Sequence, residues 1–104
     1  MKYFLIKYRF KDGSPEEWHG EIARFISELD NDPELKGKIT YRCMKGAKDS
    51  EYYHLAGAVD EQTVKLMQQR DFFKRYSEKM REVAGGAVEV SPLQIIAETQ
   101  SNVA

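Results

Sequence analysis

The order of two hydrophobic periodicities along the chain is the feature that most constrains its fold. Residues 2–10, 38–44 and 51–60 alternate in side-chain character, which is the period of a β-strand. Residues 14–30 and 61–83 repeat apolar side chains every three or four positions, which is typical of an amphipathic helix. A last strand is predicted over residues 87–97. The predicted order is therefore β-α-β-β-α-β.

Local signals mark the ends of the two helical segments. Ser14 is a suitable N-cap, and Glu17 three positions later completes a capping box. The first helix should end before Pro33, because proline disfavours helical geometry in the preceding residue. Asp60 is the predicted N-cap of the second helical segment. The polar run 68–71 within that segment indicates either a bend or two consecutive helices.

This element order predicts an α+β fold of the ferredoxin-like type, with a four-stranded antiparallel sheet and the helices on one face. Residues 1–100 should form a single domain followed by a short tail, 101–104. Pro92 within the last strand indicates an edge position or a bulge. The other sheet face would need a cover, and pairing with a second copy through the sheet faces is the simplest one. The side chains expected there are Leu5, Met44, Ala56, Ala58 and Ile96.

Composition excludes several functional classes. The 104 residues contain 16 basic and 17 acidic side chains without a basic stripe, so a nucleic-acid partner is not expected. No apolar run is long enough to span a membrane, and the N-terminus has no secretory cleavage pattern. The single cysteine, Cys43, allows no internal disulfide and fits a reducing compartment. The expected location is the cytoplasm.

Several short motifs resemble those of the dimeric α+β-barrel proteins typified by antibiotic-biosynthesis monooxygenases. They are Pro33…Gly37, Val59-Asp60, the run Arg70-Asp71-Phe72-Phe73-Lys74-Arg75-Tyr76, and Val90-Ser91-Pro92. The resemblance covers nearly the whole chain and implies a homodimer with a pocket between helices and sheet. The family includes cofactor-free oxygenases of aromatic polyketides and quinols, haem-degrading enzymes, and proteins without known activity. Fold alone does not choose among these.

Haem degradation is disfavoured by the residues that stand at the positions of that branch. Alignment on Asp71-Phe72-Phe73-Lys74 places Met67 where that branch has a tryptophan, and Ser77 where it has the iron-ligating histidine. The first predicted strand also lacks the asparagine of that branch. No metal or cofactor is expected, since no histidine or second cysteine stands at a ligand spacing from Cys43.

His54, in the middle of a predicted strand, is the best candidate for a catalytic base. Histidine titrates near neutrality, and a quinol or enol must lose a proton before it can reduce O₂. Alternation places Tyr52 on the same face, and Arg42 and Lys7 are expected there too, where Arg42 would stabilise an enolate oxygen. The alternative is that His54 is a hydrogen-bonded structural residue at a dimer interface.

A second candidate is an aromatic pocket for a flat ligand beneath the helices. Its members would be Tyr8, Tyr41, Tyr53, Trp18, Met67, Phe72 and Phe73. The alternative is that these side chains simply form the core. The two hypotheses lead to one prediction, a homodimer that binds a small aromatic or enolic molecule and acts as a cofactor-independent monooxygenase or isomerase. A non-catalytic ligand-binding or interaction module is the alternative.

Overall fold

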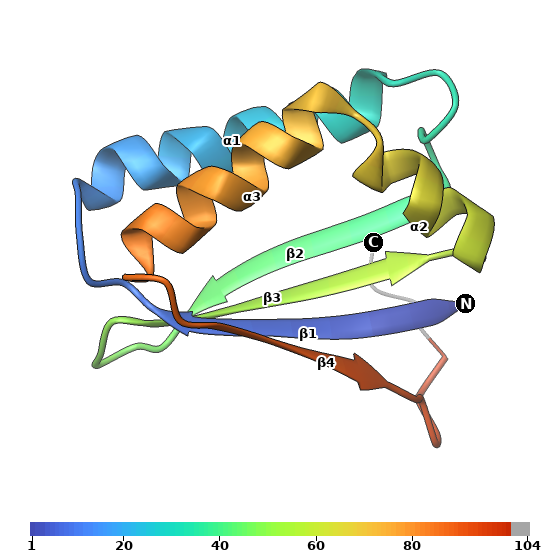
Figure 1. Cartoon of the computed structure of the whole chain (residues 1–104). Coiled ribbons are helices and arrows are strands. Elements are labelled where there is room, and N and C mark those ends of the chain that lie inside the picture. Colours follow the sequence, from blue (N-terminus) through green and yellow to red (C-terminus); the bar gives the residue numbers. More distant parts are fainter. Residues whose placement is uncertain (101–104) are drawn as a thin grey trace.

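The computed structural model describes residues 1–100 and has the element order predicted from the sequence, with the second helical segment divided in two (Figure 1). The elements are β1 (Lys2–Arg9), α1 (Pro15–Asn31), β2 (Ile39–Lys45), β3 (Glu51–Ala58), α2 (Glu61–Gln68), α3 (Asp71–Val83) and β4 (Val88–Leu93). The four strands form one antiparallel sheet of order β2-β3-β1-β4. The predicted ferredoxin-like α+β fold is confirmed. The predicted tail, 101–104, lies outside the described residues.

The helix ends follow the capping chemistry of the sequence. The Ser14 hydroxyl accepts a hydrogen bond from the backbone N–H of Glu17 at 3.3 Å, and the Asp60 carboxylate accepts one from the N–H of Thr63 at 2.8 Å. Helix α1 ends at Asn31, two residues before Pro33. Of the two alternatives for the second segment, consecutive helices are correct. Within residues 1–100 no helix is long and apolar enough to cross a membrane.

Strand β4 is shorter than predicted. It ends at Leu93, whereas the sequence pattern indicated a strand to residue 97. It pairs only with β1, so the predicted edge position of Pro92 is confirmed, and Pro92 lies opposite Phe4. Because proline has no N–H to donate, an edge strand is where it weakens the sheet least.

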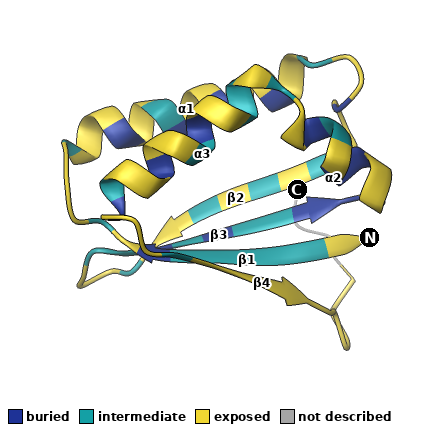
Figure 2. Cartoon of the chain, viewed as in Figure 1, coloured by how far each residue is buried: buried dark blue, intermediate teal, exposed yellow. Residues whose placement is uncertain are grey.

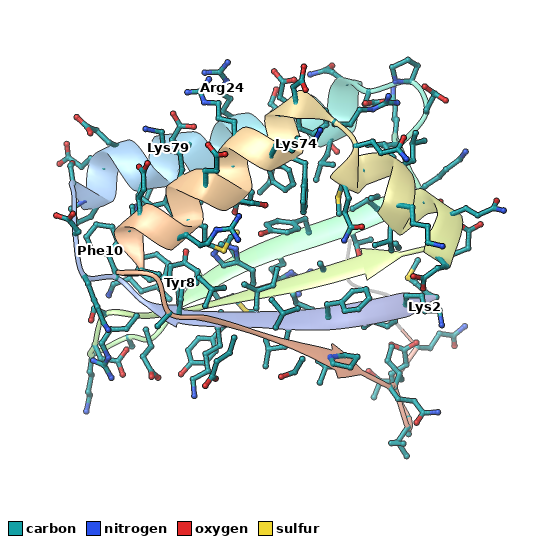
Figure 3. All side chains as sticks on the ribbon, in the orientation of Figure 1. Lys2, Tyr8, Phe10, Arg24, Lys74 and Lys79 are labelled. Atoms are coloured by element: carbon teal, nitrogen blue, oxygen red, sulfur yellow. The ribbon has the colours of Figure 1, made fainter. Side chains whose placement is uncertain are left out.

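Helices α1 and α3 lie side by side over one face of the sheet (Figure 1). The core lies between these layers, where buried positions on the helices face buried positions on the strands (Figure 2). Side chains fill this space, while Arg24 extends from α1 away from the sheet (Figure 3). The main buried members are Tyr8, Trp18, Ile22, Phe25, Leu29, Leu35, Tyr52, Met67, Tyr76, Met80 and Ala84.

The pairing register corrects the predicted sheet faces. His54 stands directly opposite Ile6 on β1 and Cys43 on β2, so these three side chains point to the helices. Arg42 pairs with Leu55 and Lys7 pairs with Tyr53, so both cations lie on the opposite face from His54. The prediction that Arg42 and Lys7 flank His54 is therefore wrong.

Two further side chains lie on the opposite sheet face from the one predicted, for the same reason. Ala56 and Ala58 share the face of His54 and point toward the helices, whereas they were expected on the uncovered face. The sequence correctly predicted which side chains of one strand share a face. It did not correctly predict which faces of neighbouring strands lie on the same side of the sheet.

The outer face of the sheet carries apolar side chains that no other described segment covers. Leu5 and Leu55 are directly paired at its centre, and Met44 beside them remains 43% exposed. Gly57 lies on the same face, where the ring of Tyr3 crosses β3. A Cβ at position 57 would stand 3.0 Å from that ring. The outer face is thus a continuous, partly apolar surface.

Candidate functional site

A cavity of about 460 Å³ lies between the helices and the sheet, and its lining includes side chains from all four strands and all three helices. The helix layer does not extend fully over β4, since Val90 points toward the helices and is still 60% exposed. The cavity is lined by Phe4, Ile6, Phe25, Tyr41, Ala56, Val64, Met67, Gln68, Phe73, Tyr76, Ser77, Met80, Arg81, Gly86, Val88 and Val90. Apolar side chains predominate, which suits a small organic ligand.

Only two aromatic hydroxyls belong to this lining, and both are part of a buried hydrogen-bonded network. The Tyr41 hydroxyl lies 2.7 Å from Nδ1 of His54 and 3.0 Å from the Tyr76 hydroxyl. The Tyr76 hydroxyl lies 3.2 Å from the same Nδ1. On the other side of the imidazole, the Tyr8 hydroxyl lies 2.8 Å from Nε2. The Trp18 indole N–H donates to the Tyr8 hydroxyl at 2.7 Å. We call these five side chains the tyrosine–histidine network.

Five of the seven elements contribute one side chain each to this network. Tyr8 comes from β1, Trp18 from α1, Tyr41 from β2, His54 from β3 and Tyr76 from α3. The rings are held by stacking as well as by hydrogen bonds. The Tyr76 ring is parallel to Phe25 at 4.0 Å between centroids and to Trp18 at 5.4 Å. Tyr8 stacks on Tyr52 at 5.3 Å. The hydroxyls therefore sit in fixed positions.

His54 is fully buried, with no exposed surface. Burial lowers its pKa to about 4, because removing water penalises the charged imidazolium. Among the described residues, no carboxylate hydrogen-bonds to the ring. His54 is accordingly neutral at neutral pH. It does not line the cavity, so a ligand reaches it only through Tyr41 or Tyr76.

The acidic groups around His54 are held in their protonated forms. Burial raises the pKa values of Tyr8, Tyr41 and Tyr76 well above the ordinary value for a phenol. Burial also raises the pKa of the neighbouring Cys43 thiol to about 11. The network therefore presents neutral hydroxyls to the cavity and no phenolate or thiolate nucleophile.

The cavity lining also contains a few polar side chains. They are Gln68 at the end of α2 and Ser77 and Arg81 on α3. Gln68 and Arg81 are exposed, and within residues 1–100 Arg81 takes part in no salt bridge.

The structure brings together three of the residues predicted from the sequence to form a site. His54 and Tyr41 are hydrogen-bonded, and Met67 lines the same cavity as Tyr41. Tyr52 is buried on the same sheet face, but its hydroxyl bonds to Nε2 of His19 at 2.7 Å and not to His54. Lys7, Arg42 and Tyr53 lie on the outer face, away from the cavity.

The remaining candidates for the aromatic pocket lie in three places. Phe73 lines the cavity, Tyr8 and Trp18 belong to the tyrosine–histidine network next to it, and Phe72 lies outside the cavity.

Sequence reasoning assigned no role to Tyr76, which is central to the site. Its position in the apolar stripe of α3 made it a core residue, and its hydroxyl gave no separate signal. The helix spacing of Phe73, Ser77 and Met80 with Tyr76 indicates that these four residues face the sheet together. The described residues contain no group of three or more histidine, cysteine, aspartate or glutamate side chains able to hold a metal ion.

Comparison with solved structures relates this architecture to known proteins. The cofactor-independent oxygenase SnoaB from Streptomyces nogalater superposes with a TM-score of 0.76 at 16% identity, covering 96% of this chain and 97% of that one. A candidate antibiotic biosynthesis monooxygenase from Caulobacter crescentus gives 0.76 at 14% identity, covering 92% and 90%. A conserved protein from Methanosarcina mazei gives 0.75 at 17% identity, covering 89% and 90%.

The fold is that of the antibiotic-biosynthesis-monooxygenase-like proteins. This agrees with the resemblance seen in the sequence motifs. No protein-family model matches the sequence, and no curated protein matches it. At these identities the likeness establishes the antibiotic-biosynthesis-monooxygenase-like fold, and the roles of individual residues rest on this chain's own geometry.

Proposed function

We propose that this chain binds a small aromatic or enolic molecule in the cavity beneath α3 and oxygenates it without a tightly bound cofactor. One observation carries the proposal: the 460 Å³ cavity is predominantly apolar but contains the paired hydroxyls of Tyr41 and Tyr76. The apolar walls suit a flat ring system, and the hydroxyls suit an oxygen substituent on it. The likeness in fold to a cofactor-independent oxygenase supports the same class of reaction.

In such a reaction the substrate supplies the electrons. The carbon of an enolate transfers an electron to O₂, the two radicals combine to form a C–O bond, and protonation gives a hydroperoxide. Loss of water then leaves a carbonyl group on that carbon. The enolate forms when the substrate gives its proton to solvent water as it enters, because the described cavity lining has no carboxylate or histidine to accept it. This ionisation is the step that the protein has to favour. A hydroxyl hydrogen held close to the enolate oxygen stabilises its charge in a site that excludes bulk water.

The alternative is a ligand-binding module without catalysis. Two observations support this alternative. His54, the base expected from the sequence, is separated from the cavity by Tyr41 and Tyr76, and the described cavity lining has no carboxylate or histidine. On this alternative the same ligand class would bind, and no O₂ would be consumed.

Removing the Tyr41 hydroxyl distinguishes the two functions. With Tyr41→Phe we expect about 10-fold weaker binding of a phenolic ligand, since one hydrogen bond is worth about 1.4 kcal/mol. O₂ uptake with polycyclic phenols and hydroquinones, measured with an oxygen electrode without added cofactor, should fall by at least as much. Tyr53→Phe is the matched control, because that hydroxyl lies on the outer face and bonds to Glu51. Binding without O₂ uptake in the wild type would favour the module and contradict the oxygenase.

We also propose that the protein acts as a homodimer that pairs through its outer sheet faces. The support is the apolar strip around the Leu5–Leu55 pair, which no described segment covers, together with the 44% exposure of Leu93. Burying this strip against a second copy would remove it from water.

Leu55→Asp tests the dimer, because it places a charge at the centre of the outer face and leaves the cavity side unchanged. We expect a monomer by light scattering coupled to gel filtration at concentrations where the wild type is a dimer. Gln62→Asp, on the exposed surface of α2, adds the same charge elsewhere and should remain dimeric. A wild type that is monomeric at all concentrations would contradict the proposed assembly.

A further inference from the structure

The donor and acceptor roles in the tyrosine–histidine network are fixed from one end, and that end is Trp18. The indole N–H can only donate, so the Tyr8 oxygen accepts from it. A neutral imidazole has one N–H and one lone pair, so Tyr8 and His54 can share their 2.8 Å contact in two ways. Either the Tyr8 hydroxyl donates to Nε2, or Nε2–H donates to Tyr8.

Burial decides between these two arrangements. If Nε2–H donated, the Tyr8 oxygen would accept two hydrogen bonds, and its own hydrogen would have no acceptor in a site where Tyr8 is 3% exposed. A buried donor without an acceptor is destabilising. If Tyr8 donates to Nε2, each hydrogen at this end has a partner. The one unshared hydrogen of the network then belongs to Tyr41 or Tyr76, which line the cavity where water or a ligand can accept it, whereas Tyr8 does not line it. Nε2 therefore accepts, and Nδ1 carries the hydrogen of His54.

The opposite end of the network then has one hydrogen too many. The Nδ1–H and the hydroxyls of Tyr41 and Tyr76 supply three hydrogens around a triangle with sides of 2.7, 3.0 and 3.2 Å. A protonated Nδ1 cannot accept, so the triangle uses one hydrogen from Nδ1 to a hydroxyl and one between the two hydroxyls. One hydroxyl hydrogen is left over. Among the described residues the Cys43 thiol lies beside Tyr76, and a thiol is only a weak acceptor.

The leftover hydrogen belongs to side chains that line the cavity. We propose that the network makes this cavity selective for ligands with a hydrogen-bond-acceptor oxygen, a carbonyl or enolate, and that His54 and Tyr8 are positioning residues that fix this polarity. This inference rests on the proposed function, because it names the ligand group that the two hydroxyls hold. It assigns His54 to orienting a donor, in place of the base that the sequence suggested.

The tautomer of His54 tests the polarity without any ligand. Long-range ¹H–¹⁵N spectra of the ligand-free protein at pH 7 distinguish a protonated Nδ1 from a protonated Nε2. His19→Gln assigns the signals, since the chain has two histidines. We expect the Nδ1–H tautomer. An Nε2–H tautomer or an imidazolium would overturn the proposal, whatever the protein binds.

Two bicyclic probes of similar size test the selectivity. 1-Indanone offers only an acceptor oxygen, and indole offers only a donor N–H. We expect 1-indanone to bind at least about 10-fold more tightly, and Tyr41→Phe combined with Tyr76→Phe to remove that preference. Equal or tighter binding of indole would overturn the selectivity and leave the ligand cavity intact. Binding of neither probe would contradict the cavity's proposed function as well.

Discussion

Lowering the pH from 6.5 to 4 is expected to reduce the free energy of unfolding by about 3 kcal/mol through His54 alone. Its pKa is about 4 in the folded chain, against 6.5 for an ordinary histidine. Between these values the unfolded chain binds a proton that the folded chain does not, so acid favours unfolding. The contribution is complete above pH 6.5, is lost as the pH falls toward 4, and changes little below that. Urea unfolding at a series of pH values measures it.

The groups around His54 do not titrate in this window. Tyr8 on β1, Tyr41 and Cys43 on β2, and Tyr76 on α3 all have pKa values raised by burial and remain neutral. His54→Gln should therefore remove most of the slope, because an amide can bond to the same hydroxyls without titrating. His19→Gln should retain the slope. If His54→Gln does not fold, an NMR titration of wild-type His54 measures the same quantity, and a pKa near 6.5 would refute the account.

Filling the cavity from β3 should abolish ligand binding while leaving the fold intact. Ala56 points to the helices between Tyr41 on β2 and Phe4 on β1, and its side chain lines the cavity. Ala56→Phe would place a ring in the space proposed for the ligand. We expect affinity to fall by roughly 100-fold, equal to about 2.7 kcal/mol, in a calorimetric titration.

The stability of Ala56→Phe should change far less than its affinity. Overpacking is costly where a core has no free volume, and here the added ring enters a cavity. Ala47→Phe, in the exposed turn between β2 and β3, adds the same ring outside the site and should bind as the wild type does. Undiminished binding by Ala56→Phe would place the ligand elsewhere.

The fold was predictable because its signals are local. Ser14 and Asp60 cap helices where the sequence indicated, and Pro92 lies on an edge strand. The periodicity of 61–83 did not choose between one bent helix and two, although the polar run 68–71 marked the place. Strand β4 stops at Leu93 because pairing with β1 ends there, and pairing is not a property of one segment.

The site was less predictable, because it depends on contacts between strands. Alternation correctly grouped Tyr52 with His54 and Lys7 with Leu5, but it did not say which groups share a face. A one-residue change of register reverses that match. The observed register puts Cys43 and not Arg42 beside His54, and replaces the expected cation with neutral hydroxyls. Tyr76 required a tertiary contact to be recognised, since only the packing of α3 brings its hydroxyl to Nδ1.

Native mass spectrometry of the wild type and Ala56→Phe, purified in parallel from the cells that make the protein, tests the central claim most directly. The account predicts a wild-type dimer that retains a small aromatic or enolic compound, and a variant dimer that has lost it. Retention of the same compound by both proteins, or by neither, would contradict the assignment of the cavity between α3 and the sheet as the ligand site.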